Sequence, residues 1–378
     1  MTDASTPAKK RSIRPVAPRS ETPPAPPRRV TMTDVALEAG CSQATVSLVL
    51  NKAPGVKISA ETRARVIKAA LKLGYAPPTF AHLEPAPSTA HSDPIGFLVD
   101  QLATSPEAVV AIDGARQAAW EDGRIVLTTQ TTNDAEMERE AIRVLTRQPL
   151  SGIIYMTIFT RRAKLPAELL SLGVPIVLLN CYDGENRLPS VVPAETAGGR
   201  TATRHMIDLG HRRIGMITGE PWMEAARDRQ KGYRQALAAA AIPFDPDLVR
   251  RGNWSASSGY DGTQALLALP RPPTAIFCQN DRMAIGCFEA LKEAGLRIPQ
   301  DMSVVGFDDE EISRHLHPRL TTLILPHRAM GGWAAKRLAA GAGAGAPVEL
   351  ECTLVARDSV AGPRAGESDC IILRRAGR

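Results

Sequence analysis

The stretch DVALEAGCSQATVSLVLN, residues 34–51, decides the first part of the fold because it has the pattern of two short helices joined by a tight turn. Thr31 and Asp34 have the spacing of a capping box that starts the first helix. Gly40 can adopt the left-handed conformation that ends a helix, and Ser42 is a natural N-cap for the second one. A third helical pattern follows, so we expect a helix-turn-helix unit.

The second helix of such a unit enters the major groove of DNA, and its outward residues meet the edges of the bases. Four residues are predicted to do so here: Gln43, Ala44, Ser47 and Leu48. Gln43 can form a bidentate pair with adenine, whereas Ala44 and Leu48 offer apolar contacts. Polar residues where phosphates would pass are predicted to fix the position on DNA: Thr31, Ser42, Thr45, Asn51, Ser59 and Thr62.

The distribution of charge supports a nucleic-acid partner for the N-terminal part. Residues 1–30 hold seven Lys and Arg against two Asp and Glu, and residues 31–76 hold six against three. Residues 1–76 therefore carry a net charge of +8 and the rest of the chain −2, out of a total of +6. A basic front on a slightly acidic body is typical of a nucleic-acid-binding module attached to another domain. Two alternatives stay open: a solvated, disordered tail at 1–29, and a helical hairpin within a larger all-α core.

Composition excludes several other classes of protein. The chain of 378 residues is too long for one ordinary domain. It has no apolar run of 18 residues and no secretory signal pattern near its start, so we expect a cytoplasmic protein that does not engage a membrane. Its six cysteines are scattered without a C-x-x-C pair, which argues against a zinc ribbon or a disulfide framework.

From residue 95 the pattern changes to short apolar runs that alternate with helical segments. The runs are IGFLVD, RIVLTT, GIIYMT, PIVLLN, RIGMIT, AIFCQN and SVVGFD. Continuous apolar runs are typical of parallel strands buried on both faces by helices. About 270 residues of this pattern exceed one sheet, so we expect two doubly wound α/β lobes.

Ligands of such sheets bind beyond the carboxyl ends of the strands. The polar residues that follow the expected strands are Asp100, Thr129, Thr157, Asn180, Glu220, Asn280, Asp281 and Asp308. There is no G-x-G-x-x-G after a strand, no P-loop and no G-x-S-x-G, and the His315 and His317 pair lacks a nearby third ligand. We therefore expect a site for a hydroxyl-rich ligand, with no catalytic residues, no cofactor and no metal.

The segment 30–77 closely resembles the DNA-binding head of the LacI (lactose-repressor) family, because D-V-A, A-T-V-S, V-L-N, E-T-R and L-G-Y-x-P occur in that family's order. The resemblance implies a homodimer on a pseudo-palindromic, double-stranded DNA operator. It also implies a hinge helix whose Leu enters the minor groove. Here Pro78 stands where the family has Asn, and Leu83 lies one residue early. Leu83 is the candidate for that contact, in a shifted register; the alternative is that this protein bends its operator less.

The segment 93–363 resembles the sugar-binding core of the same family, which has a type I periplasmic-binding-protein fold. HMIDLGHRRIGMITG, RQKGYRQAL, CQNDRMAIG, VVGFDD, RLTTLILP and LVARDSV carry the resemblance. It implies that Arg229 forks onto vicinal hydroxyls, that Asp281 accepts from them, and that Trp254 stacks on a sugar face. A structural ion pair for Arg229 and packing under a loop for Trp254 stay open. The expected effector residues are Arg229, Trp254, Asp281, Asn280, Asp100, Asn180 and Asp308.

These observations predict an all-α helix-turn-helix head followed by an α/β core of two parallel-sheet lobes. The expected parts are a basic tail (1–29), the head (30–76), a hinge (77–93), an effector and dimerisation domain (94–363) and a tail (364–378); lobe 1 spans 94–193 and 326–347, lobe 2 spans 194–325 and 348–363. The expected function is a transcriptional repressor that a sugar bound between the lobes releases from its operator. A corepressed regulator with a nucleobase-type ligand and a sugar-modifying enzyme are the alternatives.

Overall fold

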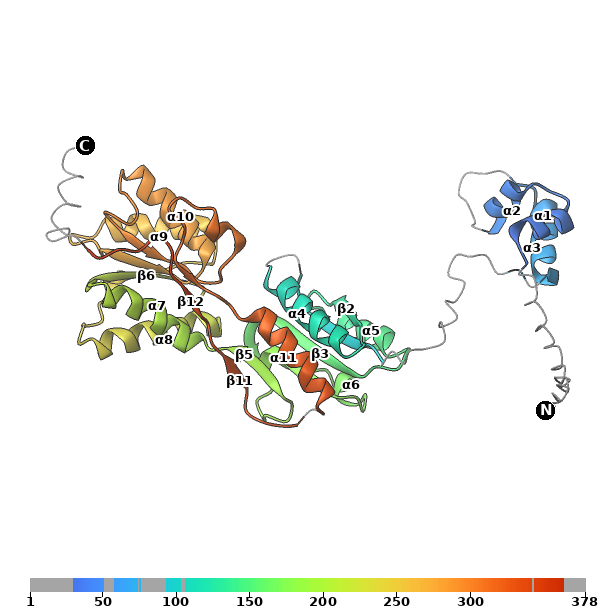
Figure 1. Ribbon diagram of the computed structural model, residues 1–378, viewed down its shortest axis with the longest axis horizontal. Helices are drawn as coiled ribbons and strands as arrows, with labels where there is room; N and C mark the ends of the chain where they lie inside the picture. The colour runs from blue at the N-terminus through green and yellow to red at the C-terminus, as the bar shows by residue number, and fades with distance from the viewer. Residues whose placement is uncertain are drawn as a thin grey trace, which may run out of the picture. The chain divides into compact units, whose positions relative to one another are not determined.

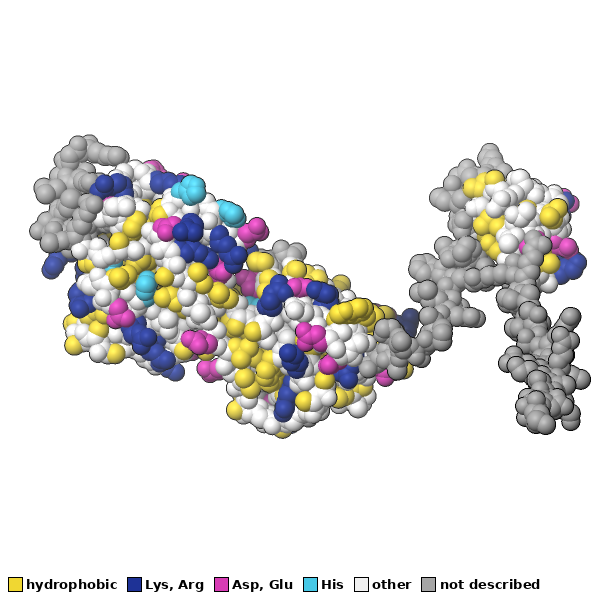
Figure 2. Space-filling view, in the orientation of Figure 1, with side chains coloured by type: hydrophobic (Ala, Val, Ile, Leu, Met, Phe, Trp, Pro, Cys, Tyr) yellow, Lys and Arg dark blue, Asp and Glu magenta, His cyan; other side chains and the backbone are white. Residues whose placement is uncertain are grey.

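The computed structural model describes residues 30–50, 58–73, 75, 93–102, 106–341 and 343–363. These residues form two compact units, one on either side of position 88 (Figure 1). Helices long and apolar enough to span a lipid bilayer are absent from the described part of the chain. Figure 2 shows Lys and Arg interspersed with Asp and Glu over the visible face of the larger unit, so the described side chains there form no extended patch of one sign.

The smaller unit is the predicted helix-turn-helix head. It consists of α1 (Met32–Ala39), α2 (Gln43–Leu50) and α3 (Ala60–Leu73). Thr31 and Asp34 form the expected capping box, and Gly40, with φ of 63°, ends α1. The three helices pack around a small core made of Val35, Ala36, Ala39, Val46, Val49, Val66, Ala69 and Ala70. Apolar residues at helical spacing therefore determine this unit locally.

The first lobe of the larger unit is a parallel sheet with strand order β11-β5-β4-β3-β1-β2 among the described residues. Its strands are β1 (Ile95–Val99), β2 (Val126–Gln130), β3 (Gly152–Arg162), β4 (Ile176–Tyr182), β5 (Ser190–Pro193) and β11 (Val348–Leu350). Its helices are α4 (Glu107–Glu121), α5 (Ala135–Leu145), α6 (Ala167–Leu170) and α11 (His327–Ala339). The apolar runs form its centre because β1, and β4 up to its last residue, are buried along their length.

The second lobe has a parallel sheet with strand order β7-β6-β8-β9 in the described part of the chain. Its strands are β6 (Ile214–Thr218), β7 (Val249–Arg251), β8 (Ala275–Cys278) and β9 (Ser303–Val305), and its helices are α7 (Glu195–Asp208), α8 (Glu224–Ala239), α9 (Ala256–Leu267) and α10 (Asp281–Glu293). Short 3-10 helices lie at Pro246–Leu248 and Glu311–Arg314. A small antiparallel pair joins β10 (Thr322–Leu323) to β12 (Leu354–Val355). The two-lobed α/β prediction is confirmed.

One predicted boundary between the lobes is wrong. The segment 348–363 was assigned whole to lobe 2, yet Val348–Leu350 forms β11 and pairs in parallel with β5 of lobe 1. The amide of Ala194 also donates to the carbonyl of Leu350 at 2.8 Å. Backbone hydrogen bonding positions this strand, and its short, mostly exposed V-E-L sequence gives no apolar run to detect. The described chain therefore passes between the lobes after β5, before α11 and after β11.

Candidate functional site: an effector cavity and a reading helix

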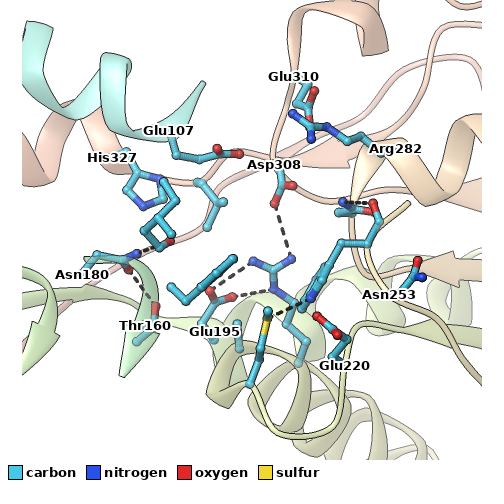
Figure 3. Close-up of a pocket in the computed structure, with 18 residues that line it drawn as sticks. Glu107, Thr160, Asn180, Glu195, Glu220, Asn253, Arg282, Asp308, Glu310 and His327 are labelled. Carbon is cyan, nitrogen blue, oxygen red and sulfur yellow. Dashed lines mark hydrogen bonds and ion pairs between the residues drawn. The ribbon is translucent and has the colours of Figure 1, made fainter. Parts of the chain in front are cut away.

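A cavity of about 300 Å³ lies between the two lobes of the larger unit (Figure 3). Lobe 1 contributes the end of β3 and Asn180 of β4 to its wall. Lobe 2 contributes residues that lie two or three positions after the ends of four strands: Glu220, Asn253, Asn280 and Asp308. Parallel strands end at the same edge of a sheet, so both lobes present their carboxyl edges to this cavity. The cavity is thus where the sequence places a ligand site.

Arg229 of α8 lines the cavity but is held by lobe 2 itself. Its Nε donates to Glu195 Oε2 at 2.7 Å and its Nη2 to Glu195 Oε1 at 3.1 Å. Its Nη1 donates to the Gln279 carbonyl and lies 3.4 Å from Asp308 Oδ1. Burial opposes protonation of the guanidinium, but the negative charges of Glu195 and Asp308 outweigh it and raise the pKa of Arg229. The structure therefore shows the ion pair that the sequence left open as the alternative.

Close packing of α7 against α8 positions this arginine. A Cβ on Gly199 of α7 would lie 2.2 Å from the Arg229 carbonyl oxygen, and one on Gly232 of α8 would lie 2.1 Å from the Thr196 oxygen. Only glycine permits such an approach of two backbones. The ring of Phe307 lies on the other side, with its centroid 3.7 Å from Arg229 Cζ.

Trp254 forms part of the cavity wall, as predicted. It has φ of 68°, its Nε1 donates to Met223 Sδ at 2.9 Å, and its carbonyl accepts from Asn280 Nδ2 at 3.0 Å. Its indole lies against the backbone at Gly219, where a Cβ would come within 2.0 Å of the ring. The hydrogen bond to Met223 and the contact with Gly219 thus hold the indole in one orientation. A ring that stacks on a sugar needs such a fixed orientation.

Asn180 and Asn280 also line the cavity, but their side-chain amides already form hydrogen bonds within the protein. Asn180 Nδ2 donates to the Thr157 and Ile158 carbonyls at 3.0 and 2.9 Å, and its Oδ1 accepts from Thr160 Oγ1 at 2.7 Å. Asn280 Oδ1 caps α10 by accepting from the Met283 amide at 2.9 Å. Asn180 therefore fixes the irregular stretch of β3 between Met156 and Arg161, where its pairing with β4 shifts register.

Asp100 and Asp281 lie outside the cavity, in contrast to the prediction. Asp281 is fully buried and accepts from Thr322 Oγ1 at 2.6 Å and from the Glu310 amide at 2.8 Å. Burial raises its pKa to about 8. Asp100 accepts from the Ile158 amide at 2.8 Å and from Arg161 Nη2 at 3.1 Å. Their places at strand ends were visible in the sequence, but the donors that turn each carboxylate away from the cavity come from distant segments.

Sequence reasoning missed several of the polar residues that line the cavity, including Thr160, Asn253 and Arg282. Four more of them carry a carboxylate or an imidazole: Glu107, Glu195, Glu310 and His327. Three of these begin helices, namely α4, α7 and α11. Glutamate is common at helix N-termini for electrostatic reasons alone, so its presence there is a weak signal of a site. Glu310 follows Asp308 by two residues and was the easiest of the four to find.

His327 and Glu107 carry buried polar atoms without a partner in the described structure. His327 is 3% exposed, and neither of its ring nitrogens has a hydrogen-bond partner. Glu107 Oε2 is likewise buried and unpaired. Burial lowers the pKa of His327 to about 4, so its imidazole is neutral near pH 7. Burial also raises the pKa of Asp308 and of Glu310, which both line the same cavity.

In the head, α2 presents its first residues to solvent. Gln43 and Ala44 are exposed, Ser47 and Leu48 are half-buried, and Val46 faces the core. Two of the four residues predicted to contact bases, Gln43 and Ala44, are thus exposed, and the base contacts themselves stay a prediction.

Residues predicted to contact phosphates lie at helix N-termini. Ser42 Oγ accepts from the Thr45 amide at 3.2 Å, and Ser59 Oγ accepts from the Thr62 amide at 3.1 Å. Thr31 is the N-cap of α1. Helix N-termini favour phosphate, so this placement suits the prediction. Asn51 and Leu83 lie outside the described residues.

Comparisons with known proteins agree with this arrangement. Residues 31–78 match the family model of bacterial regulatory proteins of the lacI family, and residues 203–360 match a periplasmic binding protein-like domain. The ribose operon repressor of Haemophilus influenzae is 31% identical over 82% of this chain and 90% of its own length. The HTH-type transcriptional repressor PurR of Vibrio parahaemolyticus is 32% identical over 80% and 88%. 

Among solved structures, a complex of the transcriptional regulator CelR with cellobiose superimposes with a TM-score of 0.60 at 29% identity, covering 88% of this chain and all of the other. The head and the core thus each match a family model, and the relatives align with most of the sequence. The chain belongs to the lacI family of bacterial regulatory proteins.

Proposed function

We propose that this regulator is a transcriptional repressor, acting in the cytoplasm, that a sugar bound between the lobes releases from its operator. The fixed indole of Trp254 on the cavity wall is the observation that carries the proposal. An aromatic ring suits the apolar face of a pyranose, and the surrounding amides and carboxylates suit its hydroxyls. CelR, which was solved with cellobiose, is a relative whose ligand has this chemistry.

A ligand in this cavity touches both lobes. Thr160 and Asn180 belong to lobe 1, whereas Asn253, Trp254 and Glu220 belong to lobe 2. A ligand shifts a conformational equilibrium only by its preference for one state, and moving it from 1:99 to 99:1 requires about 5.5 kcal/mol. Contacts to both lobes at once provide such a preference, because they exist together in only one relative position of the lobes.

On the DNA side, we propose that Gln43, Ala44, Ser47 and Leu48 read base edges of the operator. The exposure of Gln43 and Ala44 at the start of α2 supports this assignment. One head reads only half a site, so we propose a homodimer on a pseudo-palindromic operator. The N-terminal residues of α2 and α3 would contact the phosphates that flank each half-site.

The effector is tested by thermal-shift screening of the full chain against matched panels of mono- and disaccharides and of nucleobases and nucleosides. A ligand at 100 times its Kd stabilises the protein by about 2.7 kcal/mol. Sugars are expected to raise the Tm of the wild type and to lose this effect in Trp254→Ala. The exposed Trp120→Ala variant is the matched control and should respond normally. A shift with nucleobases alone would replace the sugar by the alternative ligand.

The reading helix is tested by binding-site selection from random DNA. Gln43→Ala should change the base preferred at one position of each half-site, because a bidentate contact discriminates by about 1–3 kcal/mol. Thr62→Ala is the control, since a phosphate contact should weaken binding to all sequences alike. An unchanged preference in Gln43→Ala would remove this residue from base reading.

A further inference from the structure

Three carboxylates meet across the cleft between the lobes. One oxygen each of Glu107, Asp308 and Glu310 lies within 4.8 Å of the other two. Glu107 is the first residue of α4 in lobe 1, whereas Asp308 and Glu310 follow β9 in lobe 2. Like charges at such separations repel one another strongly in a partly dehydrated site. Where these carboxylates are ionised, closure of the lobes onto this cluster is therefore opposed unless positive charge enters it.

The protein's own cations near the cluster are already engaged. Arg282 Nε lies 2.9 Å from Glu310 Oε1, and Arg229 reaches Asp308 at 3.4 Å while its other two nitrogens hold Glu195. Glu107 has no such partner among the described residues, and its Oε2 is buried and unpaired. The wall of the cavity carries five carboxylates and two guanidinium groups in the described chain. Negative charge is in excess, and Glu107 is the carboxylate of the three-membered cluster that has no ion pair with a cation of the described chain.

His327 gives a second and independent indication of a ligand. It is 97% shielded from solvent, lines the same cavity, and lies beside Glu107 (Figure 3) with both ring nitrogens unpaired. Burying a polar ring without partners costs folding free energy, so such groups are rare unless they serve a ligand. A neutral imidazole offers a lone pair to a metal ion or to an ammonium proton.

We propose that Glu107, Asp308 and Glu310 form a cation site that joins the two lobes, with the unpaired His327 beside it in the same cavity. Ligand oxygens at about 2.4 Å from a common ion lie at most about 4.8 Å apart, so the cluster fits one cation. The positive charge has two possible sources: a free divalent metal ion, or an ammonium group on a ligand in the cavity. Either relieves the repulsion between Glu107 and lobe 2 and so favours the closed state. The inference rests on the proposed function only in placing the effector in this cavity.

The metal arm of the test uses full-length protein treated with a chelator, without DNA or sugar. Mg²⁺, Ca²⁺, Mn²⁺ and Zn²⁺ are titrated separately by calorimetry, and the Tm is recorded. If the source is a metal, one ion binds once per chain, and Glu107→Gln weakens it at least tenfold. Glu168→Gln, an exposed carboxylate outside the cavity, is the matched control and should bind as the wild type does. Glu310→Gln is the second variant, in case Glu107→Gln lowers the Tm of the metal-free protein.

The ammonium arm compares pairs of ligands that differ only in an amine, such as glucosamine with glucose and galactosamine with galactose. If the source is an ammonium group, the amine binds at least tenfold more tightly than its neutral counterpart, and Glu107→Gln abolishes the difference. Failure of both arms overturns the cation site, as does metal binding that Glu107→Gln and Glu310→Gln leave unchanged. If both arms fail but neutral sugars still bind, the cation site is wrong and the proposed function is retained. Metal binding without any sugar response would remove the sugar effector but keep this site.

Discussion

Arg229 and Glu195 form a bidentate ion pair in which their side chains are only 4% and 5% exposed. Their residues lie 34 positions apart, at facing places on α8 and α7. The pair occupies two of the guanidinium nitrogens, so it sets what remains available to a ligand. A sugar hydroxyl in this cavity would meet an arginine whose charge is largely compensated.

Glu195→Ala should destabilise the core by about 3–5 kcal/mol, because it leaves a buried guanidinium without its main partner. The free energy of unfolding from urea denaturation measures this. The double variant Arg229→Met with Glu195→Leu removes both charges and should lose much less than Glu195→Ala alone. Equal losses in the single and double variants would show that packing, rather than the charge pair, sets the cost.

Gly199→Ala should destabilise the protein by about 1–3 kcal/mol, because its Cβ would lie 2.2 Å from the Arg229 carbonyl and would push α7 away from α8. The displacement should also weaken effector binding, since Arg229 lines the cavity. Gly345→Ala is the control: a Cβ there meets nothing within 4 Å. Urea denaturation and ligand titration are both needed, and an unchanged unfolding free energy in Gly199→Ala would contradict the close approach.

Gly219→Ala should weaken effector binding by displacing the indole of Trp254, against which the new methyl group would collide. Residues that act through one contact show non-additive losses. The double variant with Trp254→Ala should therefore bind the effector no worse than Trp254→Ala alone. Calorimetric titration of all three variants checks this, and additive losses would separate Gly219 from the ring.

His211 should make the stability of lobe 2 depend on pH. It is 1% exposed, its Nε2 lies 2.8 Å from the Ala361 carbonyl, and its Nδ1 lies 2.9 Å from Thr274 Oγ1. Burial lowers its pKa below 6.5. Its contribution to stability is therefore complete above pH 6.5 and is lost as the pH falls through the depressed folded-state value.

The share of His211 in the fall of the unfolding free energy with acidification should approach about 1.4 kcal/mol per pH unit in that window, and the buried His327 adds a share of its own. His211→Gln should reduce this slope, whereas the exposed His315→Gln should leave it unchanged. Urea denaturation at half-unit steps between pH 7 and pH 5 provides the measurement. Equal slopes for the wild type and His211→Gln would assign the pH dependence to other groups.

The parts of the fold that were predictable depend on local pattern. The turn at Gly40, the cap at Thr31, and the apolar spacing around Val46 and around Val66 are each encoded by residues a few positions away. The long apolar runs gave the central strands for the same reason. Short edge strands such as β7 and β11 escaped, because their positions depend on the neighbouring strand rather than on their own composition.

The sequence was sufficient to predict where the ligand site lies, but not which residues contact one another in it. Arg229 and Trp254 line the cavity as the family pattern implies. The partner of Arg229 comes from another helix, and the direction of Asp281 is set by Thr322 and by the Glu310 amide. These are tertiary contacts between segments about 30 to 40 residues apart. No pattern within one segment reveals them.

The return of the chain to lobe 1 at β11 has a consequence for protein engineering. A chimera that transplants the specificity of a relative's lobe 2 must be cut at three junctions. The last of these falls after Leu350, because Val348–Leu350 hydrogen-bonds to the edge of the lobe 1 sheet. If β11 is transplanted together with the foreign lobe 2, the edge of β5 loses its partner strand and the transplanted strand has none. If β11 is kept with lobe 1, both sheets stay complete.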